Sequence, residues 1–418
     1  MKVIGLWSAL RSLRGNQRAC VIAEPLWAIP YQLFLPFASI YMSALGVADA
    51  QIGWIASLSL AVQFFWGLLS GAIVDKYGRR ATMLVFGLMS WTIPCALWAL
   101  ARDYRYFAVA ALINGAWRVT GNSFSCLIIE GGDRDKLIQI HTLLNVIGLI
   151  AGFLSPIVGF FIDRFSLVGT MRAIYFAAMA LMTARFVLQY RLTRESEVGV
   201  HKMVQCRGRS VPSLAFGGWR AFKDALRIRR LRLCAILAVL GTCVATIQAS
   251  FWPLFVKAEY GVSDSMLALF PFVKSAVTLV VYLAFTSRIQ LSRVRRPLLV
   301  GLGAQGLGYA ALLARMQPSG AALWAVFLSA ACDAFALAML APLSESLMSR
   351  SIPDAERARI NSMVFASILL ISAPAGWIAG QLAEVHRALP LAMNLCLICV
   401  EMVIAVMIAR EVSYEFQI

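Results

Sequence analysis

The stretch GAIVDKYGRR, residues 71–80, joins two long apolar runs and decides how the chain folds. Gly71 has no side chain, so a second helix can approach it closely. Asp75 lies at the end of the first run, where its carboxylate can meet the positive N-terminus of a facing helix. Gly78 permits the tight turn into the next run. The stretch therefore predicts a short polar connection between two helices that contact other helices.

The rest of the sequence is strongly apolar. Hydrophobic residues make up 60% of the 418 residues and charged residues 14%, whereas soluble domains carry about 25% charged residues. A helix needs about 20 apolar residues to cross a bilayer. Twelve such runs lie at residues 19–45, 52–73, 82–101, 106–130, 140–162, 171–190, 232–256, 264–286, 297–315, 321–347, 361–383 and 389–409. We therefore expect an all-α polytopic membrane protein with twelve transmembrane helices.

Basic residues are distributed unevenly among the loops. The net charge of +17 would suggest nucleic acid in a soluble protein. If the N-terminus is cytoplasmic, however, the chain ends and the loops on that side hold 28 Lys and Arg, counting span-end residues with the nearest loop, and the opposite loops hold 7. This is the bias of the positive-inside rule. We therefore expect a multi-pass protein of the plasma (inner) membrane, with both termini cytoplasmic and no nucleic-acid partner.

One connection, residues 191–231, is much longer than the others and strongly basic. Apolar residues recur in it at near-helical spacing: Leu214, Phe216, Trp219, Phe222 and Leu226. This pattern favours an amphipathic helix on the cytoplasmic leaflet; the alternative is a solvated linker.

The long connection separates two sets of six spans that echo one another. Similar residues recur at an offset of 215–218 positions, in the pairs Arg79-Arg80 and Arg295-Arg296, Glu130 and Glu345, and Ser155-Pro156 and Ala373-Pro374. Such repeats are typical of transporters. The sequence predicts two pseudo-symmetric six-helix bundles, residues 1–190 and 232–418, joined by residues 191–231.

The spacing GxxxDxxGRR, between the second and third of twelve spans, resembles the loop signature of the major facilitator superfamily of transporters. The resemblance covers essentially the whole chain and implies that family's fold. It implies that Asp75 meets the eleventh span, which begins near Asn361. Arg79 and Arg80 can pair with Glu130 at the end of the fourth span. These contacts would latch the two halves on the cytoplasmic side and favour an outward-open state; the alternative is that the arginines only set the topology.

A second motif lies in the fifth span. Gly148, Gly152, Pro156 and Gly159 resemble the glycine-proline motif of the family's proton-coupled exporters, although Ser155 stands where that motif has glycine. The resemblance implies proton exchange. The alternative is that these small residues simply let helices pack.

Polar residues at depth in the first half mark a candidate cavity, because a charge at the bilayer centre costs about 2.5–3.5 kcal/mol on insertion scales. Arg118 lies near the middle of the fourth span and shares one helical face with Asn114 and Asn122. In the family this helix lines the cavity, which implies that Arg118 contacts substrate or takes part in proton coupling. The alternative is a structural ion pair.

The first span supplies further candidates. Glu24 could pair with Arg118 or carry a proton, and Tyr31 and Gln32 could form hydrogen bonds to a solute. Arg185, near the cytoplasmic end of the sixth span, is expected to reach the lipid headgroups and to have no functional role.

In the second half, Lys274 and Asp333 lie at similar depth in the eighth and tenth spans and could pair. A buried carboxylate beside a cation can exchange protons, so Asp333 is the main candidate for proton coupling. Gln248 in the seventh span adds a polar group to the same wall. Glu401 ranks lower, because the twelfth span usually lies outside the cavity in this family.

Several other classes of protein are disfavoured. The chain has no GxxxxGK[ST] loop for ATP and no HExxH or nucleophile–base arrangement of an enzyme. Cys396 and Cys399 lie in an apolar run as packing residues, and the three histidines are scattered, so we expect no metal and no cofactor. A non-transporting sensor with this fold is a remaining alternative.

We therefore expect a monomeric secondary active transporter that works by alternating access and uses a proton gradient. The motif in the fifth span and Arg118 favour proton-coupled efflux of a small amphipathic compound. The alternative is proton-coupled uptake of a polar or anionic metabolite, since Arg118 and Lys274 would suit an anion if no acid neutralises them.

Overall fold

The computed structural model describes residues 12–130, 132–133, 136–215, 223, 227–285, 295–314, 323–351 and 357–415, and these residues form helices and short connections without strands. Eleven of their helical segments are long and apolar enough to cross a bilayer. They correspond one to one with eleven of the twelve predicted spans, and the remaining span is present as two helices.

The first span is kinked where prolines remove backbone donors. It consists of α2 (Gly15–Ala23), α3 (Pro25–Phe34), η1 (Leu35–Phe37) and α4 (Ala38–Ala44). The second, third, fifth and sixth spans are α5 (Asp49–Tyr77); α6 (Arg79–Gly87), the π-helical turn η2 (Leu88–Thr92) and α7 (Ile93–Ala99); α10 (Leu137–Phe153) and α11 (Pro156–Phe165); and α12 (Leu167–Leu192).

The fourth span is divided into α8 (Tyr104–Asn114) and α9 (Trp117–Glu130). The break lies at Gly115, where a Cβ atom would come within 2.6 Å of Val62 Cγ1 on α5. The two helices together cover the predicted run 106–130, so the prediction of twelve spans is confirmed.

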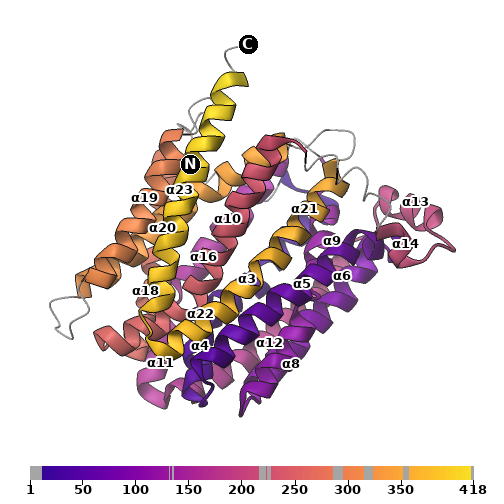
Figure 1. Cartoon of the computed structure of the whole chain (residues 1–418). Helices are drawn as coiled ribbons and strands as arrows, with labels where there is room; N and C mark the ends of the chain where they lie inside the picture. The colour runs from indigo at the N-terminus through magenta and orange to yellow at the C-terminus, as the bar shows by residue number, and fades with distance from the viewer. Residues whose placement is uncertain are drawn as a thin grey trace.

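The spans of the second half are α16 (Arg229–Tyr260), α17 (Asp264–Leu267) with α18 (Leu269–Phe285), α19 (Arg295–Ala314), α20 (Leu323–Arg350), α21 (Arg357–Ser372) with α22 (Pro374–Val385), and α23 (Leu389–Glu415). We refer to α2–α12 and α16–α23 as the first and second halves. Figure 1 shows α22 lying along α5, although these helices are far apart in sequence. The halves also meet where α10 packs on α18 and α11 on α17.

The long connection folds back on the first half. It contains α13 (Glu197–Gln205) and α14 (Val211–Ala215), and both helices pack against α5. Of the apolar residues that predicted an amphipathic helix, Leu214 lies in α14. Phe216, Trp219, Phe222 and Leu226 lie outside the described residues, so that helix stays a prediction.

Candidate functional site

Arg79 is the centre of the polar network at one end of the bundle, which we call the motif end. Its guanidinium binds both oxygens of Glu130, with Nε–Oε2 and Nη2–Oε1 distances of 3.0 and 3.1 Å. The same guanidinium lies 3.0 Å from Oδ1 of Asp75, one helical turn earlier. Gly78 makes the turn with φ of +85°, which a side chain would strain. The expected pairing of Arg79 with Glu130 is present.

Arg80 does not share that role. Its Nε donates to the carbonyl oxygen of Tyr190 at 2.8 Å, and its guanidinium lies 3.9 Å from the centre of the Tyr190 ring. The expected pairing of Arg80 with Glu130 is therefore wrong, because Arg79 already occupies both carboxylate oxygens. Glu195, which the sequence analysis missed, accepts the backbone N–H groups of Arg79 and Arg80 at 2.9 and 3.0 Å. An acid directly after the sixth span was the available signal.

Asp75 is not bound to the second half in this conformation, since its ion-pair partner among the described residues is Arg79. The expected partner of Asp75 is the start of the eleventh span, near Asn361. The side chain of Asn361 lies outside the described part of the chain. Gly71 faces the first half, where a Cβ atom would lie 4.0 Å from Nδ2 of Asn122. Among the residues that the structure describes, no contact of Asp75 with the second half forms the expected latch.

The two halves are closed together at the opposite end, which we call the far end. A Cβ atom on Gly53 of α5 would lie 2.3 Å from the carbonyl oxygen of Gly376 on α22. Ser57 Oγ accepts the Trp377 N–H at 2.6 Å. An ion pair joins Arg387 Nε to Asp49 Oδ2 at 2.7 Å. Backbone contact, a hydrogen bond and an ion pair thus seal one side of the far end.

The motif of the fifth span seals the other side. Cβ atoms on Gly152 and Gly159 would lie 2.1 Å from Ser275 Oγ and 2.7 Å from the Ser265 carbonyl oxygen, both in the second half. Ser155, at the kink before Pro156, donates its hydroxyl to the carbonyl oxygen of Ala268 at 2.7 Å. Gly148 lines the space between the halves. The small residues therefore serve close packing between halves, as the alternative interpretation expected.

A cavity of about 1090 Å³ lies between the halves. The first half contributes Tyr31, Gln32 and Gln63 to its wall, and the second contributes residues of α16, α18, α19, α20 and α23. The cavity reaches Ser344 of α20, next to Glu345. Glu345 is the repeat counterpart of Glu130 at the motif end, so the cavity extends toward that end. Five residues predicted to bind substrate line it: Tyr31, Gln32, Gln248, Lys274 and Asp333.

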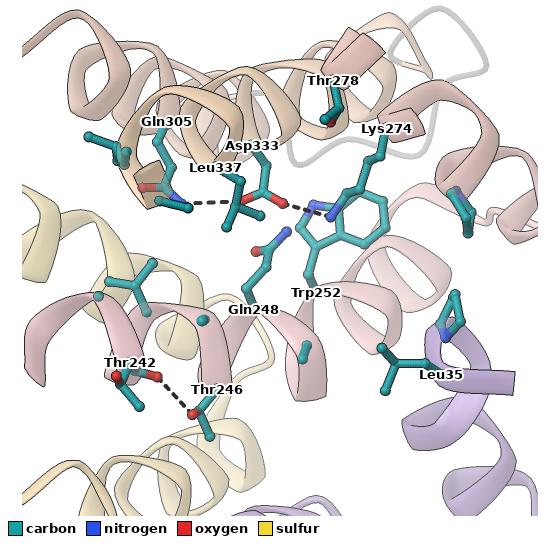
Figure 2. A pocket seen from close by; sticks show the side chains of 18 of the residues that line it. Leu35, Thr242, Thr246, Gln248, Trp252, Lys274, Thr278, Gln305, Asp333 and Leu337 are labelled. Atoms are coloured by element: carbon teal, nitrogen blue, oxygen red, sulfur yellow. Dashed lines mark hydrogen bonds and ion pairs between the residues drawn. The ribbon is translucent and has the colours of Figure 1, made fainter. Parts of the chain in front are cut away.

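The strongest polar contact in this wall joins Lys274 of α18 to Asp333 of α20. The Nζ–Oδ2 distance is 2.6 Å, and Gln305 of α19 donates to Oδ1 of Asp333 at 3.1 Å. Figure 2 shows Asp333 between these two donors, with the Trp252 ring beside Lys274. The predicted pairing is present. Gln305 was missed in the sequence, because a glutamine inside an apolar run carries no charge to single it out.

Gln248 is held in a second polar chain behind the cavity surface. It accepts a hydrogen bond from the hydroxyl of Tyr309. Asn394 Nδ2 donates to the same hydroxyl oxygen at 3.0 Å. These contacts fix the Gln248 amide, which lies at the cavity wall beside Asp333 and Trp252 in Figure 2.

Arg118 lies beside the cavity rather than among its lining residues. Its Nε donates to Oε1 of Gln63 at 3.0 Å, and its guanidinium is stacked 4.2 and 4.7 Å from the ring centres of Trp117 and Phe365. Phe365 belongs to α21, so Arg118 bridges the two halves. Asn114 donates to the Ser90 carbonyl oxygen at 2.7 Å.

Asn122, at the other end of the face predicted to carry Asn114 and Arg118, also makes its contact within the first half. Asn122 accepts a contact from Cys126 Sγ at 3.9 Å. Asn114, Arg118 and Asn122 are absent from the described residues that line the cavity.

Glu24 pairs with Arg185 rather than with Arg118. The distance from Arg185 Nη2 to Glu24 Oε2 is 2.9 Å, and the arginine is 5% exposed. The rings of Phe124 and Phe186 lie against its guanidinium. Two expectations are therefore wrong: Glu24 does not meet Arg118, and Arg185 does not reach the headgroups. The carboxylate of Glu24 holds the guanidinium inside the first half.

Glu401 lines the cavity and is 3% exposed. Its low ranking rested on the usual position of the twelfth span, and here α23 contributes to the wall directly. No group of three or more metal-ligating side chains occurs in the described part of the chain.

The chain belongs to the Major Facilitator Superfamily, whose sequence profile matches residues 27–376. The tetracycline resistance protein, class C, of Escherichia coli is 23% identical over 334 residues, covering 77% of each chain. The multi-drug resistance efflux pump PmrA of Streptococcus pneumoniae (strain ATCC BAA-334 / TIGR4) is 27% identical over 158 residues, 36% of this chain and 38% of its own.

Solved structures show the same fold. The transporter PepTSo of the POT family superposes with a TM-score of 0.71 at 13% identity, covering 96% of this chain and 98% of that one. The nucleoside transporter NupG gives 0.69 at 15% identity, covering 97% and 100%. The protein is therefore a membrane-embedded, multi-pass transporter of small solutes.

Proposed function

We propose that the protein exports a small amphipathic compound in exchange for protons. The observation that carries this proposal is the cavity between the halves, which is sealed at the far end and holds a carboxylate–ammonium pair in its wall. Such a cavity suits alternating access, in which the halves close in turn around one central site. The names of the relatives that resemble this chain, a tetracycline resistance protein and an efflux pump, support export.

The lining supports an amphipathic solute. Apolar side chains such as Leu60, Leu149, Phe270 and Leu337 form much of the wall. The charged side chains among the described lining residues, Lys274, Asp333 and Glu401, all belong to the second half. Small-molecule sites are commonly built in this way, with apolar walls for affinity and a few polar groups for orientation. Asp333 offsets the charge of Lys274, so this cation gives little advantage to an anion.

Asp333 is the proposed proton carrier. When ionised, it holds Lys274 of α18 and Gln305 of α19 together. When it takes a proton, the ion pair is lost and α18 is released from α20. Because α18 also packs against α10 of the first half, this step can change how the halves meet. Glu24 has a different proposed role, since its pairing with Arg185 lies inside the first half.

The loop charges support a cytoplasmic motif end in the inner membrane, so that the described state faces inward. Arg118 supports a second candidate function, uptake of an anionic metabolite, because its partners among the described residues are the Gln63 amide and two aromatic rings rather than an acid. The two functions differ in the direction of movement under the same pH gradient.

The test uses purified protein as a monomer in proteoliposomes, with a panel of amphipathic drugs and an imposed pH gradient. We expect the wild-type protein to move the drug in the direction opposite to proton flow. The variant Asp333→Asn should lose the pH-driven part of the flux while it still inserts and folds. Asp264→Asn is the matched control, because it also removes the acid of a Lys–Asp pair, to Lys257 at 2.5 Å, but lies outside the cavity. Normal coupling in Asp333→Asn would contradict the proposed proton route.

A further inference from the structure

Glu401 is a buried acid that the proton route above does not use. It lies on α23, is 3% exposed and lines the cavity together with Gly241 of α16. A Cβ atom on Gly241 would lie 3.3 Å from Oε1 of Glu401 and would meet no other atom within 4 Å. The missing side chain therefore leaves a space at the cavity wall directly beside the carboxylate.

No hydrogen-bond donor or cation is recorded for Glu401 among the residues that the structure describes. The other buried acids among the described residues differ: Asp333 binds Lys274, Glu24 binds Arg185 and Asp49 binds Arg387. The hydroxyls nearest in sequence to Gly241 are also engaged elsewhere. Thr242 and Thr246 donate to carbonyl oxygens of their own helix, each at 2.7 Å, as Figure 2 shows for the contact between them.

The internal repeat explains why a partner is missing. Glu401 follows Arg185 by 216 positions, the same offset that separates Arg79 from Arg295. In the first half, Arg185 is neutralised by Glu24. The position 216 residues after Glu24 is Leu240, beside Gly241. The second half therefore places an acid at one repeated position and an uncharged leucine, Leu240, at the position that would hold its partner.

The charge of the cavity follows from its lining. The Lys and Asp side chains of the wall are Lys274 and Asp333, which offset one another, and Glu401, when ionised, adds one negative charge that no described neighbour balances. A buried carboxylate without a partner is costly. A positively charged group on the solute would supply the missing partner, and its attraction to the carboxylate would offset the cost of removing both charges from water.

We propose that Glu401, together with the space left by Gly241, binds the positively charged nitrogen of the exported compound, so that the preferred substrates are amphipathic organic cations. This inference rests on the proposed export function and narrows its substrate class. The apolar wall would hold the body of the compound while the carboxylate holds its charge. Among the described residues, Cys243 of α16 and Tyr309 of α19 interact electrostatically with Glu401, and neither supplies a positive charge.

The test measures binding of ethidium, a permanently charged and fluorescent amphipathic cation, to the full-length protein in lipid nanodiscs. Chloramphenicol, which is neutral, is measured in parallel by calorimetry. We expect Glu401→Gln to weaken ethidium binding by about tenfold or more, because a charge-assisted contact is lost, and to leave chloramphenicol binding unchanged. Glu401→Asp should retain most of the ethidium affinity, since it keeps the charge.

Two further variants separate charge from folding. Gly241→Leu fills the space beside the carboxylate and should weaken ethidium binding while Glu401 is intact. Glu411→Gln makes the same chemical change on the same helix, at a residue paired with the exposed Arg229, and should leave binding unchanged. Absence of ethidium binding to the wild-type protein, or equal affinity in wild type and Glu401→Gln, would overturn the proposal. Export of a neutral drug under a pH gradient would in that case still support the proposed function.

Discussion

Buried ion pairs in this protein differ in what lies beside them. Lys274 and Asp333 form part of the cavity wall, where solvent or solute can replace either partner. Glu24 and Arg185 lie within the first half, enclosed by aromatic rings. We therefore assign exchange chemistry to the first pair and a structural role to the second.

This assignment predicts the effect of Glu24→Gln. The substitution leaves Arg185 buried without its carboxylate, a loss of about 3–5 kcal/mol in folding free energy for buried pairs, and the melting temperature in detergent should fall clearly. Glu411→Gln should change stability by less than about 1 kcal/mol, because its partner Arg229 is 64% exposed. If Glu24→Gln melted like wild type but lost pH-driven flux, Glu24 rather than Asp333 would be the proton carrier.

The sequence predicted how deep polar side chains lie in their spans better than it predicted which way they point. Lys274 and Asp333 were matched correctly, because counting residues along two spans that run in the same direction gives the relative depth of each side chain. Glu24 was matched to the wrong arginine, since depth does not say which way a helix face points. Packing of α12 in the first half turns the face that carries Arg185 toward Glu24, and no local sequence pattern encodes this orientation.

At the scale of elements, apolar runs predicted the spans well because the bilayer itself sets their length. The break at Gly115 was not predictable, since it depends on Val62 of another helix. The role of Gly53 was missed for the same reason. A lone glycine in an apolar run gives no indication of the helix that will cross it.

The crossing of α5 and α22 predicts a conformational effect of Gly53→Ala. A Cβ atom there would lie 2.3 Å from the Gly376 carbonyl oxygen and 2.7 Å from the Gly380 Cα atom, so the far end cannot close without a shift. We expect greater labelling of a reporter, Ser57→Cys, on a background without the nine native cysteines, because Ser57 lies in the sealed interface.

Gly303→Ala is the control for this experiment, since a Cβ atom on Gly303 meets nothing within 4 Å. It should leave labelling of the reporter unchanged and raise helix stability by a few tenths of a kcal/mol up to about 1 kcal/mol. Unchanged labelling in Gly53→Ala would show that the closed crossing accommodates a Cβ atom without opening, and would contradict the close approach of the two helices.

For the whole molecule, the two ends of the cavity compete. In the described state the far end is closed by Asp49–Arg387 and by helix contacts, while Asp75 at the motif end is bound to Arg79 of its own half. The alternating access that we propose requires these contacts to exchange, so the free energies of the two closures should lie close together. Small changes at either end should then shift the populations measurably.

Asp49→Asn and Asp75→Asn should therefore shift the molecule in opposite directions. Asp49→Asn removes the far-end ion pair, whose arginine side chain is 36% exposed. An ion pair with an exposed partner contributes about 0.2–1 kcal/mol. The far-end-open population should therefore rise by up to about fivefold. Asp75→Asn should lower it, because the motif-end closure loses its carboxylate. Labelling of Ser57→Cys reports both shifts, and the double variant should return toward the wild-type level. Asp163 is an exposed acid at the far end, so Asp163→Asn is the control and should have no effect. Shifts of the same sign in both single variants would contradict a competition between the ends.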